Sequence, residues 1–159
     1  MSSRFSTADM HLLYCVETTS GTRPTTGYTE IPEVKSVPSF NPQPDSIETT
    51  TLAETEYRTY VKGLKSLDGA LDFGANLTAD LISTWETMVS AYGTGKAANP
   101  EKATWFCVMH AGLAKAVFFK GEPANLGLDQ ADVGNPLETT LYITPQSAPE
   151  WQTKPTVTT

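Results

Sequence analysis

The sequence predicts a mainly β fold (α+β) with one α-helix and a long extended arm. Threonine accounts for 24 of the 159 residues, and its branched Cβ favours strands over helices. Eleven glycines and eleven prolines divide the chain into short segments separated by turns. Apolar side chains recur at helical spacing in one stretch, residues 77–92. At this length we expect one domain with a real hydrophobic core.

The N-terminal part predicts two short strands. Residues 11–16 form a short apolar segment, and residues 28–34 alternate apolar and polar side chains. Between them lies a run of glycine, proline and hydroxyl residues that is typical of turns. Three prolines in residues 38–44 then exclude a central strand and favour an extended path.

Residues 35–66 predict an arm, because they have few large apolar side chains and therefore little capacity to form a core. Such a long segment inside a compact domain is usually disordered or functional. We expect it to fold against a neighbouring copy and to be mobile in the free subunit, since ordering a backbone costs roughly 1–2 kcal/mol per residue. The predicted anchors are its apolar and aromatic side chains: Ile47, Leu52, Tyr57, Tyr60, Val61 and Leu64.

Residues 67–75 alternate strictly and predict a strand with two different faces. Leu71 and Phe73 are on the face that suits a core. Asp68 and Asp72 are on the other face, where the side chains are small or acidic.

The helix predicted for residues 77–92 has a plausible beginning and end. Thr78 is the expected N-cap and Asp80 stands in the first turn, where its charge is favourable. Gly93 and Gly95 are the expected stop. The apolar stripe predicts packing against one face of the sheet.

The C-terminal half predicts three further strands and a tail. Residues 103–110 and 113–120 predict a hairpin, and its continuous hydrophobicity indicates that both faces are covered. A turn-rich acidic stretch follows, then an alternating strand at residues 137–144. Residues 146–159 are predicted to be an extended or disordered tail.

Composition excludes several classes of function. A net charge of −7 argues against a grip on nucleic acid, because such proteins use Lys and Arg to displace counterions. The sequence has no run of about 18 apolar residues, so it predicts no membrane span. The first residues lack the apolar core of a signal peptide. Cys15 and Cys107 do not make a disulfide framework, so we expect reduced, buried thiols.

The chain offers no constellation typical of catalysis or metal binding. His11, Cys15, Cys107 and His110 supply four nitrogen and sulfur ligands that could form a zinc site. However, positions 107 and 110 point to opposite faces of a strand, and positions 11 and 15 are ~13 Å apart along one. We therefore expect core thiols and edge histidines, with no metal and no cofactor. Recognised nucleophile, zinc-protease and phosphate-loop motifs are also missing, which indicates that the protein is not an enzyme.

Several segments resemble a known family. They are Ile31-Pro32, SIETTTL at residues 46–52, EYRTYVKGLK at residues 56–65, and GALDF at residues 69–73. Over residues 11–145 the chain resembles the major tail protein, or tail tube protein, of long-tailed bacteriophages. The resemblance implies a two-sheet β-sandwich or partial barrel with a flanking helix, formed by residues 1–145.

The resemblance also implies a function. Six copies would form a ring, and stacked rings would form the hollow tail tube that conducts genome DNA during ejection. The implied partners are the protein itself and the tail length-setting, tail-tip and terminator proteins, with DNA passing without specific binding and no membrane contact. The implied location is the virion tail, after assembly in the host cytoplasm.

The arm would then contact the neighbouring ring, and Asp68 and Asp72 are candidates for the lumen, although an ordinary solvated strand face explains them equally well. Alternatives from other classes remain open. One is a head–tail joining protein that forms one ring and stops. Another is a β-sandwich that decorates a capsid or binds a surface sugar. The third is a small enzyme with a scattered site.

Overall fold

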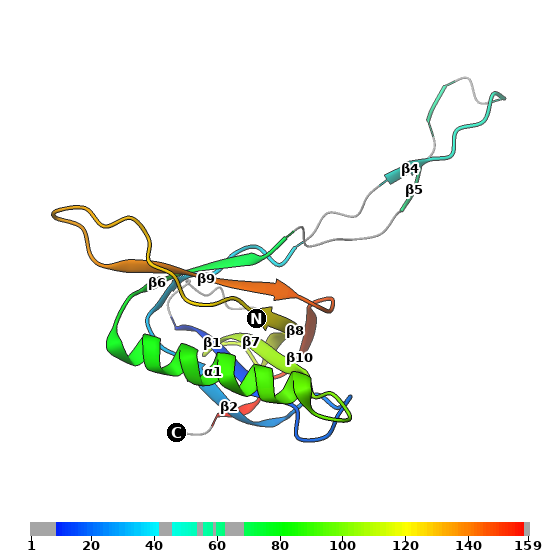
Figure 1. Cartoon of the computed structure of the whole chain (residues 1–159). Helices are drawn as coiled ribbons and strands as arrows, with labels where there is room; N and C mark the ends of the chain where they lie inside the picture. Colours follow the sequence, from blue (N-terminus) through cyan, green and yellow to red (C-terminus); the bar gives the residue numbers. More distant parts are fainter. Residues whose placement is uncertain (1–8, 42–45, 54–55, 59, 63–68, 158–159) are drawn as a thin grey trace. The chain divides into compact units, whose positions relative to one another are not determined.

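The computed structural model describes residues 9–41, 46–53, 56–58, 60–62 and 69–157, the last two residues of each of the final two ranges by their backbone alone. It confirms a mainly β fold with one helix (Figure 1). The chain divides into two compact units. The main unit consists of Met1–Pro38 and Ala70–Thr159, and the hairpin unit is Ser39–Gly69.

The main unit contains a nine-stranded sheet. Eight strands follow the order β11-β2-β1-β7-β8-β9-β6-β3, and the ninth, β10, pairs with β8. All pairs are antiparallel except β11 with β2. The strands are β1 (Met10–Val16), β2 (Thr26–Ile31), β3 (Val34–Ser36), β6 (Leu71–Asn76), β7 (Thr104–His110), β8 (Lys115–Pro123), β9 (Glu138–Pro145), β10 (Glu150–Thr153) and β11 (Thr156–Val157).

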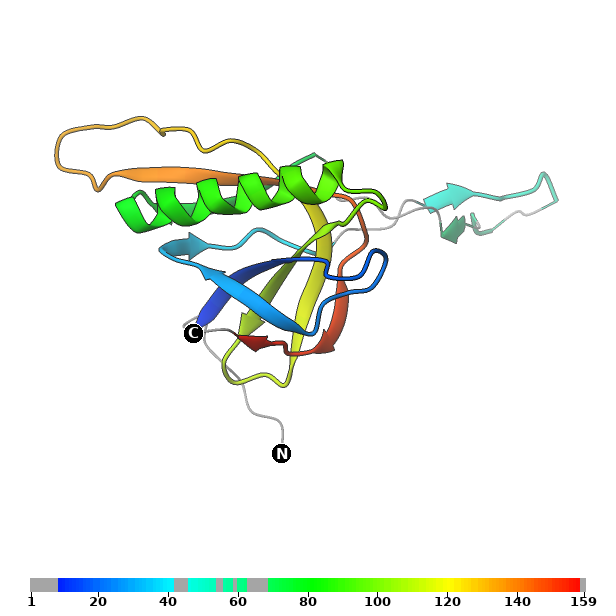
Figure 2. The same cartoon turned by 60° about the horizontal axis from the view of Figure 1, so that its bottom comes forward.

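The two sheets of the predicted sandwich are joined through β8, so they form one strongly bent sheet that does not close into a barrel. The first half of β8 pairs with β10, and its last residues pair with β9 along the same edge. Figure 2 shows β8 running from one half of the sheet to the other. Gly121 lies at this bend, where a Cβ would be 2.6 Å from Cγ2 of Ile143 and 3.1 Å from the ring of Phe106. Glycine therefore permits the close packing of the two halves.

The strand predicted for residues 28–34 is in fact two strands, which corrects the sequence prediction. The chain turns at Pro32 and at Glu33, whose φ is 66°. Before the turn β2 pairs with β1, and after it β3 pairs with β6. Proline has no N–H to donate in a sheet ladder, so β2 ends before Pro32. The turn then carries the chain from one half of the sheet to the other.

The helix α1 (Ala79–Ala97) begins where the sequence predicted, but the predicted stop is wrong. The Thr78 hydroxyl accepts a hydrogen bond from the Leu81 N–H at 3.2 Å, as an N-cap does. The helix continues through Gly93 and Gly95 to Ala97. Its buried side chains include Leu81, Trp85 and Met88, and it lies against β1, β2 and β8.

Both faces of β7 and β8 are buried within the single chain, as their continuous hydrophobicity predicted. One face carries a cluster formed by Leu13, Tyr28, Trp105, Cys107, Ala116 and Phe118. The rings of Tyr28 and Phe118 meet edge-on at 5.8 Å, and the Arg23 guanidinium lies 4.4 Å above the Phe118 ring. The cover of this face is intramolecular and requires no neighbouring subunit.

The C-terminal segment predicted to be extended or disordered is extended, and it has strand partners. Between β9 and β10 the N–H of Gln146 donates to the Lys120 carbonyl at 2.7 Å. Residues 150–153 then form β10 on β8, and residues 156–157 form β11 on β2. The segment thus connects the two outer strands of this half of the sheet (Figure 2).

Glu17 is a buried carboxylate at the end of β1. One oxygen accepts from the N–H groups of Ala103 at 2.8 Å and Gly21 at 3.2 Å, and the other accepts from the Trp105 indole at 2.9 Å. Burial alone would raise the pKa of Glu17, but these hydrogen bonds and the Lys120 ammonium outweigh it, so the pKa is lowered.

Both cysteines are free thiols. Burial raises the pKa of Cys107 to about 12 and raises that of Cys15 as well. A thiol with a raised pKa is a poor nucleophile and a poor metal ligand. The predicted burial is confirmed for Cys107, whereas Cys15 is only partly buried.

Candidate assembly surfaces

The hairpin unit presents apolar side chains on a two-stranded ribbon. Strands β4 (Ser46–Glu48) and β5 (Tyr60–Lys62) pair antiparallel, with Ile47 opposite Val61 and Glu48 opposite Tyr60. The guanidinium of Arg58 lies 3.9 Å from the Glu48 carboxylate, and both side chains are largely exposed. A ribbon of two strands is at best marginally stable in water, so its stability depends on what else it contacts.

Four of the six predicted anchors can be placed, and they are exposed in the single chain. The exposed fractions are 55% for Ile47, 105% for Leu52, 80% for Tyr57 and 53% for Tyr60. For Val61 the structure describes only the backbone, and Leu64 lies outside the described residues. Their contacts with another copy remain a prediction.

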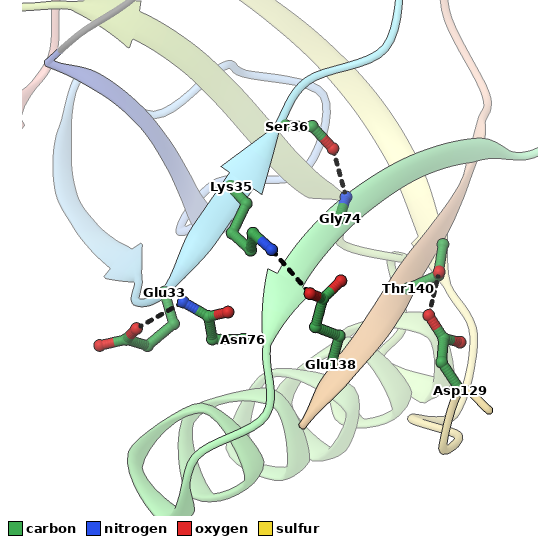
Figure 3. A network of polar contacts seen from close by, with 8 residues as sticks. All are labelled: Glu33, Lys35, Ser36, Gly74, Asn76, Asp129, Glu138 and Thr140. Atoms are coloured by element: carbon green, nitrogen blue, oxygen red, sulfur yellow. Dashed lines mark hydrogen bonds and ion pairs between the residues drawn. The ribbon is translucent and has the colours of Figure 1, made fainter. Parts of the chain in front are cut away.

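A polar face covers the outside of β3, β6 and β9 (Figure 3). The Lys35 ammonium lies 2.8 Å from the Glu138 carboxylate, and the Thr140 hydroxyl donates to Asp129 at 2.9 Å. The amide of Asn76 donates to Glu33 at 3.4 Å. On the side that faces away from the core, two of these contacts link β3 or the turn before it to β9 and β6, and the contact of Thr140 links β9 to the loop that precedes it.

Asp72 belongs to this polar face. The neighbouring side chains in β6 are buried, with 6% exposure for Leu71 and none for Phe73, so alternation directs Asp72 outward. It stands opposite Tyr142 in the ladder with β9. Within the described residues, the carboxylates of Glu33, Asp72, Asp129 and Glu138 share the face with the ammonium of Lys35, so the face is acidic. Asp68 lies outside the described residues.

The strand β3 has a bulge where it pairs with β6. Val34 is opposite Ala75, and Ser36 is opposite Gly74, so the register shifts between them. The Ser36 hydroxyl accepts from the Gly74 N–H at 3.1 Å, in a place where a Cβ on Gly74 would be 2.5 Å from the same oxygen. Bulges and charged side chains such as Lys35 discourage pairing between sheet edges.

The loop of residues 124–137, which joins β8 to β9, is a surface that the sequence analysis missed. Its exposed apolar side chains are Leu128 at 65%, Val133 at 105% and Leu137 at 50%. The sequence of this stretch predicts only turns and an acidic character. The available signal was the presence of leucine and valine in a stretch with no strand or helix periodicity.

The described residues contain no cluster of three or more His, Cys, Asp and Glu side chains that could hold a metal ion. The register places His11 opposite Met109 and Cys107 opposite Leu13. The N–H of Gly112 donates to Nδ1 of His110 at 2.9 Å, which closes the turn after β7. No helix in the described part of the chain combines the length and apolarity needed to cross a membrane.

Comparison with known proteins identifies a shared fold. No protein-family model and no curated protein sequence matches the chain. A solved structure that matches is the cryo-electron microscopy structure of the anti-feeding prophage (AFP) baseplate, sixfold symmetrised, one chain of which aligns with a TM-score of 0.62. The two chains are 10% identical, and the match covers 96% of this chain and 98% of the other.

Proposed function

We propose that this protein is a structural subunit of a phage-like tail, and that copies of it assemble into stacked rings forming the hollow tail tube. In this role it carries no catalytic site and uses no cofactor. It occupies the tail of the virion after assembly in the host cytoplasm, and DNA passes through the lumen during ejection. The observation that carries the proposal is the fold shared along nearly the whole chain with a component of a sixfold-symmetrised baseplate.

The hairpin unit supports self-assembly. Its exposed side chains Ile47 and Tyr60 lie on a ribbon that is marginal by itself, and Leu52 and Tyr57 lie in the segment that joins the two strands. Burying them against another copy would stabilise both the ribbon and the contact, at roughly 25 cal/mol per Å² of apolar surface. The proposed partner is a subunit of the adjacent ring.

The acidic face of β3, β6 and β9 supports a lumen role. Carboxylates on this face repel phosphate, whereas proteins that hold DNA use Lys and Arg. A conduit lined in this way would let DNA slide without binding. Tail length-setting, tail-tip and terminator proteins are further proposed partners, through the family resemblance alone.

A second candidate is a tail-end or head–tail joining protein that forms one ring and stops. The similar chain belongs to a baseplate, which favours a component at the end of a tail as much as one along its length. Single rings and extended stacks differ in mass, so native mass spectrometry distinguishes the two candidates.

The proposal is tested with purified protein at increasing concentration, examined by negative-stain electron microscopy. We expect hollow tubes from the wild type. A variant with Ile47→Ser, Leu52→Ser and Tyr57→Ser should need at least about a hundredfold more protein to assemble, because each substitution loses apolar burial of ~1–2 kcal/mol.

The control is Ile82→Ser, which removes an apolar side chain that is 37% exposed on α1. It should assemble like the wild type. Wild-type protein that stays monomeric at every concentration would refute self-assembly, and single rings alone would favour the second candidate.

A further inference from the structure

The loop of residues 124–137 is an exposed apolar and acidic surface held firmly at its base. The Trp85 indole donates to the Ala124 carbonyl at 2.8 Å, and the Thr139 hydroxyl donates to the Gly127 carbonyl at 2.8 Å. Beyond this base the side chains of Leu128 and Val133 are 65% and 105% exposed. The loop sequence contains Asp129 and Asp132 and no Lys or Arg, so its charge is −2.

The other end of β8 carries the complementary charge. There the β7–β8 turn exposes Leu113 at 39% and is followed by the exposed Lys115. Lys154 lies beside the turn, with its ammonium donating to the Ala111 carbonyl at 3.1 Å. The carbonyl of Asp9 accepts from the Ala111 N–H at 3.2 Å, so two lysines and one aspartate give this end a charge of +1 in the described residues.

The two surfaces lie at opposite ends of one strand. The nine residues of β8 separate their bases. The strand changes direction at the bend between them, and residues 124–127 continue beside β9. Two complementary surfaces in different places on a molecule make a head-to-tail contact, which either closes into a ring or repeats from copy to copy as an open stack.

We propose that the loop of residues 124–137 docks on the β7–β8 turn of a second copy of this chain, with Leu128 and Val133 against Leu113 and Asp132 near Lys115 and Lys154. This inference rests on the proposed stacking and names the surfaces that make it. The contact is separate from the hairpin unit, so stacking has two independent attachments. Apolar side chains supply the affinity, and the charges at the rim orient the approach.

Disulfide trapping tests the contact directly. Val133→Cys and Leu113→Cys are made in separate molecules, mixed and oxidised mildly, and their cross-linking is compared with that of Val133→Cys and Ser83→Cys, a pair with its second thiol on the exposed face of α1. The native thiols are wholly or partly buried, and wild-type protein measures their background. We expect the first pair to cross-link at least about tenfold faster, because docking raises the effective concentration.

A charge exchange gives a second readout in full-length protein. Asp132→Lys and Lys115→Glu should each raise the critical concentration of assembly about threefold, as expected for exposed charges. The double variant carries both changes and restores opposite charges across each contact, so it should assemble like the wild type. Glu86→Lys on α1 controls for the change in net charge.

The outcomes separate this inference from the proposed function. Tubes without the specific cross-link would overturn the docking surface and leave the tube proposal standing. The specific cross-link in soluble pairs that never form tubes would support the surface and refute the tube. Equal cross-linking of both pairs, or a double variant as weak as the single ones, would contradict the proposed contact.

Discussion

At the scale of single residues, Glu17 is a carboxylate in a buried environment. A carboxylate is costly to bury unless it is hydrogen-bonded, and here three donors from the Gly21 and Ala103 backbone and the Trp105 ring meet it. The residue thereby ties the end of β1 to the beginning of β7. Nothing in the sequence around position 17 distinguishes it from the other acidic residues.

We expect Glu17→Gln to destabilise the protein by about 1–3 kcal/mol at pH 7, because the amide NH₂ would face one of these donors and leave it unpaired. The pKa of Glu17 is lowered below its ordinary value of 4.5. Its contribution is therefore complete above that ordinary value and is lost as the pH falls through the folded-state pKa. The difference from the wild type should shrink in acid.

Urea unfolding at pH 7 and pH 3 measures this difference, with the exposed Glu86→Gln as control. A Glu17→Gln variant with wild-type stability at pH 7 would show that the buried hydrogen bonds contribute nothing net.

At the scale of elements, the end of α1 shows how packing overrides a local signal. Glycine often marks the end of a helix, yet Gly93 and Gly95 both lie within this one. A Cβ at Gly95 would be 2.7 Å from the Lys102 carbonyl oxygen and 3.0 Å from Cγ1 of Val16, whereas nothing lies within 4 Å of one at Gly93. Gly95 thus permits close packing of the helix on the chain that follows it.

The two glycines form a matched pair for mutation. Gly93→Ala should stabilise the protein by about 0.5–1 kcal/mol, because alanine is the better helix former. Gly95→Ala should destabilise it by about 1–3 kcal/mol, because the added methyl meets backbone that cannot move away easily. Urea midpoints of the two variants check the signs, and stabilisation by both would contradict the close packing at Gly95.

At the scale of the whole molecule, the C-terminal segment completes the main unit. It pairs with β8 through β10 and with β2 through β11, on the half of the sheet that holds the cluster around Tyr28 and Phe118. Removing it would leave two strands with unpaired edges.

A chain that stops after Ser147 should therefore be less stable by about 3 kcal/mol, or roughly 10 °C in melting temperature, from the lost ladder hydrogen bonds. Trp151→Ala keeps the strand and removes a side chain that is 60% exposed, so it should change stability little. Thermal unfolding followed by circular dichroism compares the two. An unchanged melting temperature for the truncated chain would mean that β10 and β11 do not support the sheet.

Helices and strands could be predicted from the sequence better than exposed surfaces. Helical periodicity predicts the helix at residues 77–92, and alternation predicts a strand at residues 67–75. The helix is confirmed, and the strand is confirmed from residue 71 on; residues 69 and 70 precede it, and residues 67 and 68 lie outside the described residues. Residues 35–66 have few large apolar side chains, and from this an arm is predicted. The hairpin unit, Ser39–Gly69, overlaps most of this segment. Leucine and valine in a stretch without periodicity indicate that the loop at residues 124–137 is unusual. Their exposure could not be predicted, because exposure depends on what covers a side chain.

The sequence by itself determined the β class, the helix with its Thr78 cap and the outward direction of Asp72, because periodicity, capping and alternation act over a few residues. Only the tertiary structure decided the turn at Glu33, the course of α1 through Gly95, the joining of two sheets on β8 and the burial of Glu17. Each of these depends on contacts between segments far apart in the chain, which no local pattern records.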